Sequence, residues 1–213
     1  MRNLLYKELR LAAHPNLYVF ACMGALVLVP AYPYGAVFMF GCLGPYISVS
    51  YARENHDAFY TALLPVPKRD AVKAKLLMFA AAQIAQLVFS VPFAFLRTLY
   101  LPQGNPAGIE ANAAYYGFGL LIFAVFDFIF FAEFYKTAYK AGRAFLLGFI
   151  PAMLLVAAME AAAHVPAFAW IDSTAPACQL LQLPVLAAGA LIYPAALFTA
   201  YRVASKEFEK VDL

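Results

Sequence analysis

Charge is scarce in this sequence. Of its 213 residues, only 13% are Asp, Glu, Lys or Arg and 65% are hydrophobic, whereas a soluble domain carries about 25% charged and about 45–50% apolar residues. So few charges cannot cover a water-facing surface, which excludes a water-soluble globular protein and predicts a lipid solvent. The 15 Lys and Arg residues gather at the ends of apolar runs, and this placement argues against nucleic-acid binding despite a net charge of +3.

Cysteines and the motifs of soluble catalysis are also sparse. Three cysteines, an odd number without paired ligand spacing, argue against a disulfide framework or a metal site. The three histidines lie on different loops and helix ends. The sequence has no G-x-x-x-x-G-K-[ST], H-E-x-x-H or G-x-S-x-G motif. The chain therefore cannot hold a nucleotide through a P-loop of its own, and we expect no cofactor or metal bound by it.

Long apolar runs are what the sequence has in abundance. Six of them approach the ~20 residues that a helix needs to cross a bilayer, and they cover residues 17–31, 34–51, 76–101, 113–134, 144–163 and 183–201. They predict an all-α integral membrane protein with a single transmembrane domain over residues 1–213. We expect the first run to be an uncleaved helix, because no clear small-x-small cleavage site follows it. Residues 165–182 are too polar and proline-broken for a plain span, and predict an interfacial or partly re-entrant segment anchored by Trp170.

The basic residues predict the orientation. With six spans, 14 of the 15 Lys and Arg residues fall on the N-terminal segment, the second and fourth loops and the tail, all on one side. The positive-inside rule then places both termini in the cytoplasm. Only Arg97 falls on the other side, where Glu160, near the outer end of the fifth span, is its expected partner.

The second loop, residues 52–75, carries the most informative pattern. Within it, residues 54–64 mix charges with apolar side chains at about i, i+4 spacing, which predicts a short amphipathic helix ended by Pro65. Asn55 or Asp57 could cap its start. From periodicity alone, this helix could lie on the membrane surface, enter a groove of a cytoplasmic partner, or serve as a solvated connector.

Two stretches of the sequence resemble a known family. The run Leu63–Lys75 (L-L-P-V-P-K-R-D-A-V-K-A-K), with Glu54 upstream, resembles the loop after the second helix in ATP-binding-cassette permeases of the type-2 exporter class. Pro65 and Pro67 stand where family members commonly have serine. The opening stretch 1–12, with L-L-Y-K-E-L-R at its centre, resembles the family's cytoplasmic interfacial helix.

The resemblance implies a half-transporter of a bacterial cytoplasmic membrane. Such an exporter permease pairs with a second membrane subunit, and two separate ATPase subunits below them bind ATP and Mg²⁺. A hydrophobic or amphipathic substrate, such as a peptide, suits an interior of this composition. The resemblance also implies that the helix of the second loop is the coupling helix, which seats in the ATPase through Glu54, Asn55, His56, Asp57, Phe59, Tyr60, Leu63 and Leu64.

Polar residues inside the predicted spans mark candidate positions of a substrate pathway. Gln83, Gln86 and Ser90 share one face of the third span, and Asp127 lies deep in the fourth. Contact with lipid is costly for such groups, so we expect them to face protein or water. They either line a pathway or form hydrogen bonds between helices, Asp127 with a neighbouring Tyr or Gln. Both interpretations stay open at the level of sequence.

Two other functions are compatible with the sequence. An intramembrane enzyme would use Asp127 together with Glu133 or Gln83, and would need polar groups that converge at one depth of the membrane. A structural or immunity-type membrane protein without transport would use these groups for stability alone.

Overall fold

The computed structural model describes residues 1–100 and 104–211, and the regular structure within these ranges is entirely helical. The expected all-α class is therefore confirmed. Five long helices are α3 (Ala36–Glu54), α5 (Lys68–Tyr100), α6 (Ala113–Phe134), α7 (Ala141–Ala163) and α9 (Pro176–Glu209). The shorter segments are α1 (Arg2–Lys7), the π-helical turn η1 (Glu8–Ala12), α2 (Asn16–Cys22), the 3₁₀ helix η2 (Met23–Leu28), α4 (Asp57–Ala62), the 3₁₀ turn η3 (Pro166–Phe168) and α8 (Ala169–Asp172).

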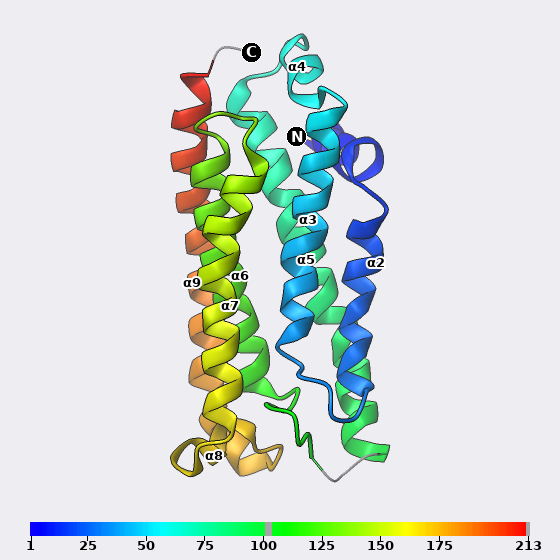
Figure 1. Cartoon of the computed structure of the whole chain (residues 1–213), viewed down its shortest axis with the longest axis vertical. Helices are drawn as coiled ribbons and strands as arrows, with labels where there is room; N and C mark the ends of the chain where they lie inside the picture. Colours follow the sequence, from blue (N-terminus) through cyan, green and yellow to red (C-terminus); the bar gives the residue numbers. More distant parts are fainter. Residues whose placement is uncertain (101–103, 212–213) are drawn as a thin grey trace.

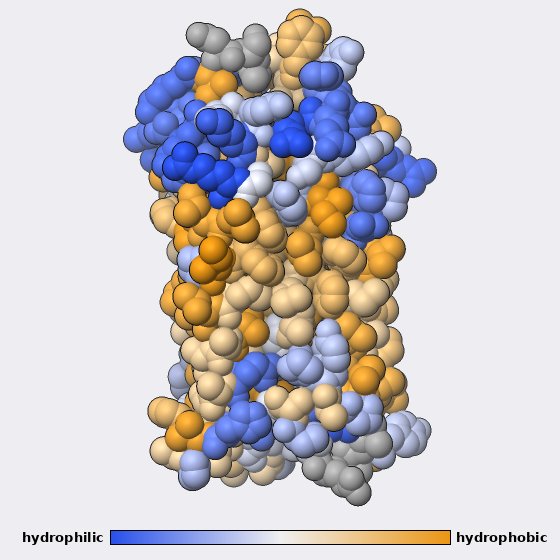
Figure 2. All heavy atoms as spheres, in the orientation of Figure 1, coloured by the Kyte–Doolittle hydropathy of each residue, from blue (hydrophilic) through white to orange (hydrophobic). Residues whose placement is uncertain are grey.

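The long helices run side by side along the long axis of the molecule (Figure 1). The N-terminus, α4 and the end of α9 lie at one end of this bundle, and α8 lies at the other (Figure 1). The end with the termini carries mostly hydrophilic residues, and a hydrophobic band follows it along the bundle (Figure 2). This distribution is the one expected of a bundle that sits in lipid with a charged end in water.

Four helices, α5, α6, α7 and α9, are long and apolar enough to cross a membrane. A fifth crossing results if residues 2–12 and 16–28, which meet at an angle of 92°, count as one bent span. Within residues 1–100 and 104–211, the helices therefore allow four to five such crossings by length and composition. A bend close to a right angle also suits a first segment that lies along a membrane surface while the next segment enters it.

Several helix boundaries differ from those expected. The helix α5 begins at Lys68, eight residues before the predicted start, and α9 begins at Pro176, seven residues before. Proline at the first helical turn lacks only an N–H that has no partner there, so Pro176 starts a helix where we expected it to break one. The first predicted span is α-helical only to Cys22 and continues as 3₁₀ helix to Leu28.

The most extensive helix packing among the described residues is between α6 and α9, which approach each other at two glycines. A Cβ atom on Gly117 would lie 2.6 Å from the carbonyl carbon and oxygen of Val185, and one on Gly189 would lie 3.1 Å from the Cα atom of Gly117. Small residues let helix backbones approach closely inside a membrane, where apolar burial contributes little to association. This contact holds α9 against α6, and both helices then contribute side chains to the sites described below.

Candidate functional site

The helix α4 forms at the charged end of the molecule because the chain turns sharply after α3. The Nδ2 atom of Asn55 donates a hydrogen bond to the Tyr51 carbonyl at 3.1 Å, and His56 takes the left-handed conformation with φ 54° and ψ 29°. The helix that follows covers Asp57–Ala62, shorter than the predicted 54–64, and its start has no side-chain cap. Glu54 belongs to the last turn of α3.

Two faces of the α4 region have different character, as expected for an amphipathic segment. Thr61 is buried, and the side chain of Asp57 is only 20% exposed. Four large apolar side chains of α4 and of the turn that follows it are exposed instead, namely Phe59, Tyr60, Leu63 and Leu64. This segment lies at the hydrophilic end of the bundle (Figures 1 and 2). Apolar side chains exposed there mark a surface suited to contact with another protein.

The inner face of α4 meets a cluster of four charged residues, which we call the ionic cluster: Lys7, Glu8, Asp57 and Lys75. The Nζ atom of Lys7 lies 2.8 and 2.9 Å from the two carboxylate oxygens of Asp57, and also donates to the Thr61 hydroxyl at 2.9 Å. The Nζ atom of Lys75 lies 2.9 Å from Glu8 and 3.6 Å from Asp57. Two cations and two carboxylates thus balance one another where α1, η1, α4 and α5 meet.

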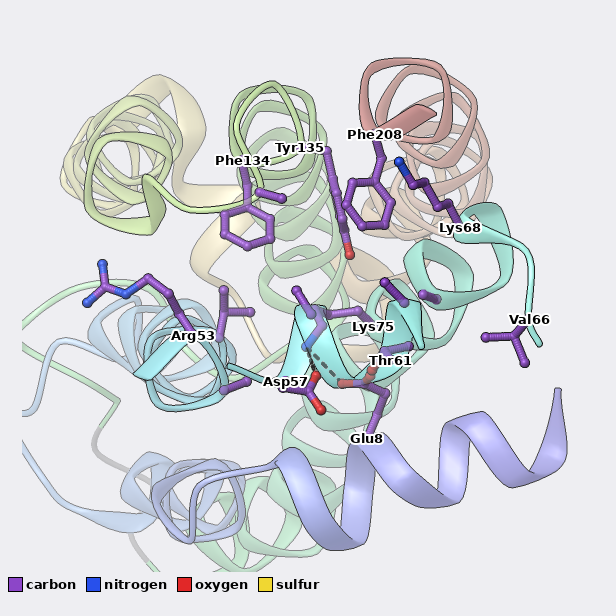
Figure 3. Close-up of a pocket in the computed structure, with 16 residues that line it drawn as sticks. Glu8, Arg53, Asp57, Thr61, Val66, Lys68, Lys75, Phe134, Tyr135 and Phe208 are labelled. Atoms are coloured by element: carbon purple, nitrogen blue, oxygen red, sulfur yellow. Dashed lines mark ion pairs between the residues drawn. The ribbon is translucent and has the colours of Figure 1, made fainter. Parts of the chain in front are cut away.

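A cavity of about 90 Å³ lies beside the ionic cluster. Asp57, Lys75 and Glu8 line one wall, and the rings of Phe134 and Phe208 stand on the opposite side (Figure 3). The cavity thus separates α4 from the ends of α6 and α9.

A second group of polar side chains is buried in the middle of the bundle. The Nε2 atom of Gln83 donates to Asp127 Oδ1 at 2.9 Å, and the Tyr193 hydroxyl donates to Gln83 Oε1 at 2.7 Å. This chain of hydrogen bonds joins α5, α6 and α9. The expected hydrogen bond between Asp127 and a neighbouring Gln is therefore present, and Tyr193 is a partner that the sequence did not single out.

The rest of the polar stripe on α5 is also buried and bonded within the chain. The Nε2 atom of Gln86 donates to the Phe20 and Val37 carbonyls, each at 3.0 Å. The Ser90 hydroxyl donates to the Leu87 carbonyl at 2.7 Å. Gln86 and Ser90 are both buried, as the sequence predicted. Gln86 thus bonds across to α2 and α3, whereas Ser90 bonds within α5 and also lies 3.0 Å from the Tyr116 hydroxyl of α6. Hydrogen bonds between helices account for these contacts, and a role in a substrate pathway stays a prediction.

One predicted ion pair differs at the end of the bundle that lies opposite α4. Arg97 lies 3.7 Å from Glu110, to which it is paired, and donates to the Gly104 carbonyl at 2.6 Å, so the expected pairing with Glu160 was wrong. Glu160 instead accepts hydrogen bonds from the backbone N–H groups of Gly35 and of Ile109. Glu110 lies in a loop without periodicity, which left no signal in the sequence. Burial raises the pKa of the Glu110 carboxyl, although Arg97 lowers it in part.

Two amide side chains that the sequence did not single out organise the same end. Asn112 Oδ1 accepts a hydrogen bond from the Tyr115 N–H at 3.1 Å and thereby caps α6. The Nε2 atom of Gln182 donates to the carbonyls of Trp170 and Ser173 at 2.7 and 2.9 Å. An Asn directly before an apolar run is a recognisable capping signal, whereas the partners of Gln182 depend on the tertiary fold.

The residues required by the enzyme hypothesis converge only in part. Asp127 meets Gln83, but Glu133 pairs with Lys136 and Arg143 at the far end of α6. Among residues 1–100 and 104–211, no group of three or more His, Cys, Asp or Glu side chains is arranged to hold a metal ion.

Comparison with known proteins identifies the class. A family model described as ABC-2 family transporter protein matches residues 3–203, nearly the whole chain. The chain belongs to this family and is a multi-pass membrane permease subunit of the ABC-2 type. No curated protein and no solved structure matches it.

Proposed function

We propose that this chain is the transmembrane subunit of an ATP-driven exporter in a bacterial cytoplasmic membrane. Two membrane subunits pair above two separate ATPase subunits, which bind the ATP and Mg²⁺. The transported molecule is hydrophobic or amphipathic, and a peptide fits this description. Membership of a permease family supports the transport role, and the mostly apolar composition of the chain suits such a substrate.

The observation that carries the proposal is the outward face of α4. The exposed side chains Phe59, Tyr60, Leu63 and Leu64 lie at the hydrophilic end of the molecule, outside the apolar band that lipid would cover. A few anchor side chains supply most of the binding energy at protein interfaces, and tyrosine is among the residue types enriched at such positions. In this proposal they seat in the ATPase, and Glu54, Asn55 and His56 form the turn that presents them.

Six membrane crossings follow if α2 with η2 and α3 are added to the four long helices. The 19 residues of α3 extend about 28 Å at 1.5 Å per residue, close to the ~30 Å of a hydrocarbon core. The N-terminus, α4 and the end of α9 lie at one end of the bundle (Figure 1), and 14 of the 15 basic residues belong to the segments predicted for that side. The positive-inside rule then makes this end cytoplasmic.

The substrate pathway assigned to Gln83, Gln86, Ser90 and Asp127 belongs to the same proposal. Within the chain these groups bond to other side chains or to backbone carbonyls, so they would reach a substrate only if α5, α6 and α9 rearranged. Rigid-body movement of packed helices is the kind of transition that would expose them.

A matched pair of variants tests the docking surface. Tyr60 is 63% exposed on α4, and Tyr139 is 65% exposed in the turn before α7. We expect Tyr60→Ser combined with Leu63→Ser to weaken binding of the co-expressed ATPase about tenfold or more, the loss expected for interface anchors. Tyr139→Ser should bind like the unaltered chain. Equal retention of the ATPase by all three proteins on an affinity column would overturn the proposed surface.

A further inference from the structure

The helix α4 is held to the bundle mainly by the ionic cluster. Its backbone packs against α3, which precedes it in the chain. A cavity of about 90 Å³ separates it from the ends of α6 and α9. The strong contacts of its inner face are therefore those of Asp57 and Thr61 with Lys7, at 2.8 to 2.9 Å.

The same cluster includes residues of three further elements. Lys7 ends α1 and Glu8 begins η1, while Lys75 lies in the second turn of α5. Glu8 lies 2.9 Å from both lysines, so it links the N-terminal segment to α5 as well as to the cation that holds α4. Figure 3 shows α1 crossing below α4, with Asp57, Glu8 and Lys75 pointing toward one another between the helices.

The burial of the cluster sets it apart from ordinary surface pairs. The side chains of Lys7 and Asp57 are 18% and 20% exposed, and that of Glu8 is 2% exposed. Exposed ion pairs separate at little cost in free energy because water and salt screen the attraction between the charges. A shielded pair keeps its geometry more rigidly, because separation would leave a poorly hydrated charge without a counter-ion. A displacement of α4 is therefore expected to carry the groups bound to it.

We propose that the ionic cluster makes residues 2–12 a second arm of the coupling apparatus, that is, a second segment that moves together with α4 when the ATPase moves. When the ATPase moves α4, Lys7 and Glu8 move the N-terminal segment with it, and Lys75 passes the displacement to α5. Lys7, Glu8, Asp57 and Lys75 are positioning residues in this account. The inference rests on the proposed docking of the ATPase on α4, and adds an element whose role the docking surface alone does not require.

Hydrogen exchange on the intact complex of this chain with its ATPase tests the proposal. The exchange rate of residues 2–12 is compared between the nucleotide-free complex and the complex trapped with ATP and vanadate. We expect the rate to change in the unaltered protein. In Lys7→Met, whose side chain has nearly the same length without the charge, we expect this change to fall by about fivefold, at the low end of typical coupling between sites.

Two control variants and three further measurements make the result specific. Lys7→Arg keeps the charge and should keep the nucleotide-dependent change in residues 2–12. Lys210→Met removes a lysine whose partner is Glu207 on an exposed surface, and should also leave it intact. Thermal unfolding and retention of the ATPase, measured on each variant, establish that the complex is assembled, and exchange in α4 reports whether the nucleotide signal still arrives there.

The outcomes separate this proposal from the one on which it rests. An assembled Lys7→Met complex that keeps the change in α4 and loses it in residues 2–12 supports the second arm. A change in residues 2–12 that survives in Lys7→Met, or that is absent from the unaltered complex while α4 responds, overturns it. Failure of the unaltered chain to bind the ATPase at all would instead overturn the proposed docking, and this inference with it.

Discussion

Adding one methyl group to Gly117 tests the close approach of α6 and α9. In Gly117→Ala, the new Cβ atom would lie 2.6 Å from the carbonyl carbon and oxygen of Val185 and 2.7 Å from the nitrogen of Leu186. Carbon atoms in contact prefer about 3.5–4.0 Å, so the two helices must separate locally by about 1 Å. Because the obstructing atoms belong to the backbone, no side-chain rotation can relieve the clash.

The expected cost follows from two opposing effects. Overpacking a close-packed site costs about 1–3 kcal/mol, whereas replacing Gly with Ala inside a helix contributes about 1 kcal/mol in the other direction. The net loss in the free energy of unfolding is then up to about 2 kcal/mol. For a chain of this length, each kcal/mol shifts the Tm by about 2–4 °C. We expect the Tm to fall by up to about 8 °C.

Thermal unfolding in mild detergent, followed by size-exclusion chromatography after heating, measures this shift. Gly142→Ala is the matched control, because the nearest atom its Cβ would meet is the Tyr46 hydroxyl at 3.9 Å. This control should unfold at the same temperature as the unaltered protein or higher. A Gly117→Ala protein as stable as Gly142→Ala would refute the close contact between α6 and α9.

Four further variants, at three positions, test the polar networks by the same thermal assay. Glu160→Gln replaces one of the two carboxylate oxygens, which accept backbone N–H groups, including that of Ile109. We expect the free energy of unfolding to fall by about 2 kcal/mol, as for hydrogen bonds to charged groups. An unchanged Tm would contradict this expectation. Asp127→Asn keeps an acceptor for Gln83 and should be about as stable as the unaltered protein, whereas Asp127→Leu leaves the amide without a partner and should cost about 1–3 kcal/mol; equal losses would disprove the hydrogen bond. Burial raises the pKa of the Asp172 carboxyl, so the folded state favours the protonated carboxyl. The stability that this protonated form contributes is therefore lost as pH rises through the folded pKa. The Tm of the unaltered protein should therefore rise relative to Asp172→Asn as pH falls from 7 toward 4, and the opposite trend would contradict the direction of the shift.

The sequence predicts the helical class and the buried face of α5 because both depend on periodicity. Gln83, Gln86 and Ser90 recur at helical spacing, and a polar stripe in an apolar helix must turn away from lipid. That pattern contains no information about which neighbouring helix supplies the partner. The bond to Asp127 was anticipated from its depth, but Tyr193 lies in α9, 110 positions away from Gln83, and only the tertiary packing brings it there.

Boundaries and loop contacts were less predictable for physical reasons. Pro176 and the polar residues after it suggested an irregular segment, but proline is tolerated at the start of a helix and the amide of Gln182 finds carbonyl partners at Trp170 and Ser173. The predicted partner of Arg97 was wrong because its actual partner, Glu110, lies in a loop without periodicity. In both cases, long-range hydrogen bonds satisfy polar groups that local sequence leaves unassigned.

The candidate coupling segment was predicted in outline only. Its amphipathic pattern could be recognised from the sequence because Phe59 and Leu63 are four residues apart. The helix ends before Pro65, as predicted. The ionic cluster was not predicted, since Lys7 and Asp57 are 50 positions apart. A sequence shows that such charges exist, but their pairing depends on the angle at which the N-terminal segment crosses α4.

The central claim is that a separate ATPase docks on α4, and co-purification tests it most directly. The chain is expressed with its genomic neighbours, extracted in mild detergent and isolated by a tag on the membrane subunit, and ATP hydrolysis is measured on the eluate. The account predicts that the ATPase co-purifies and that both its retention and its hydrolysis fall in Tyr60→Ser combined with Leu63→Ser. A chain that purifies alone, or one whose bound ATPase is unaffected by these substitutions, would contradict it.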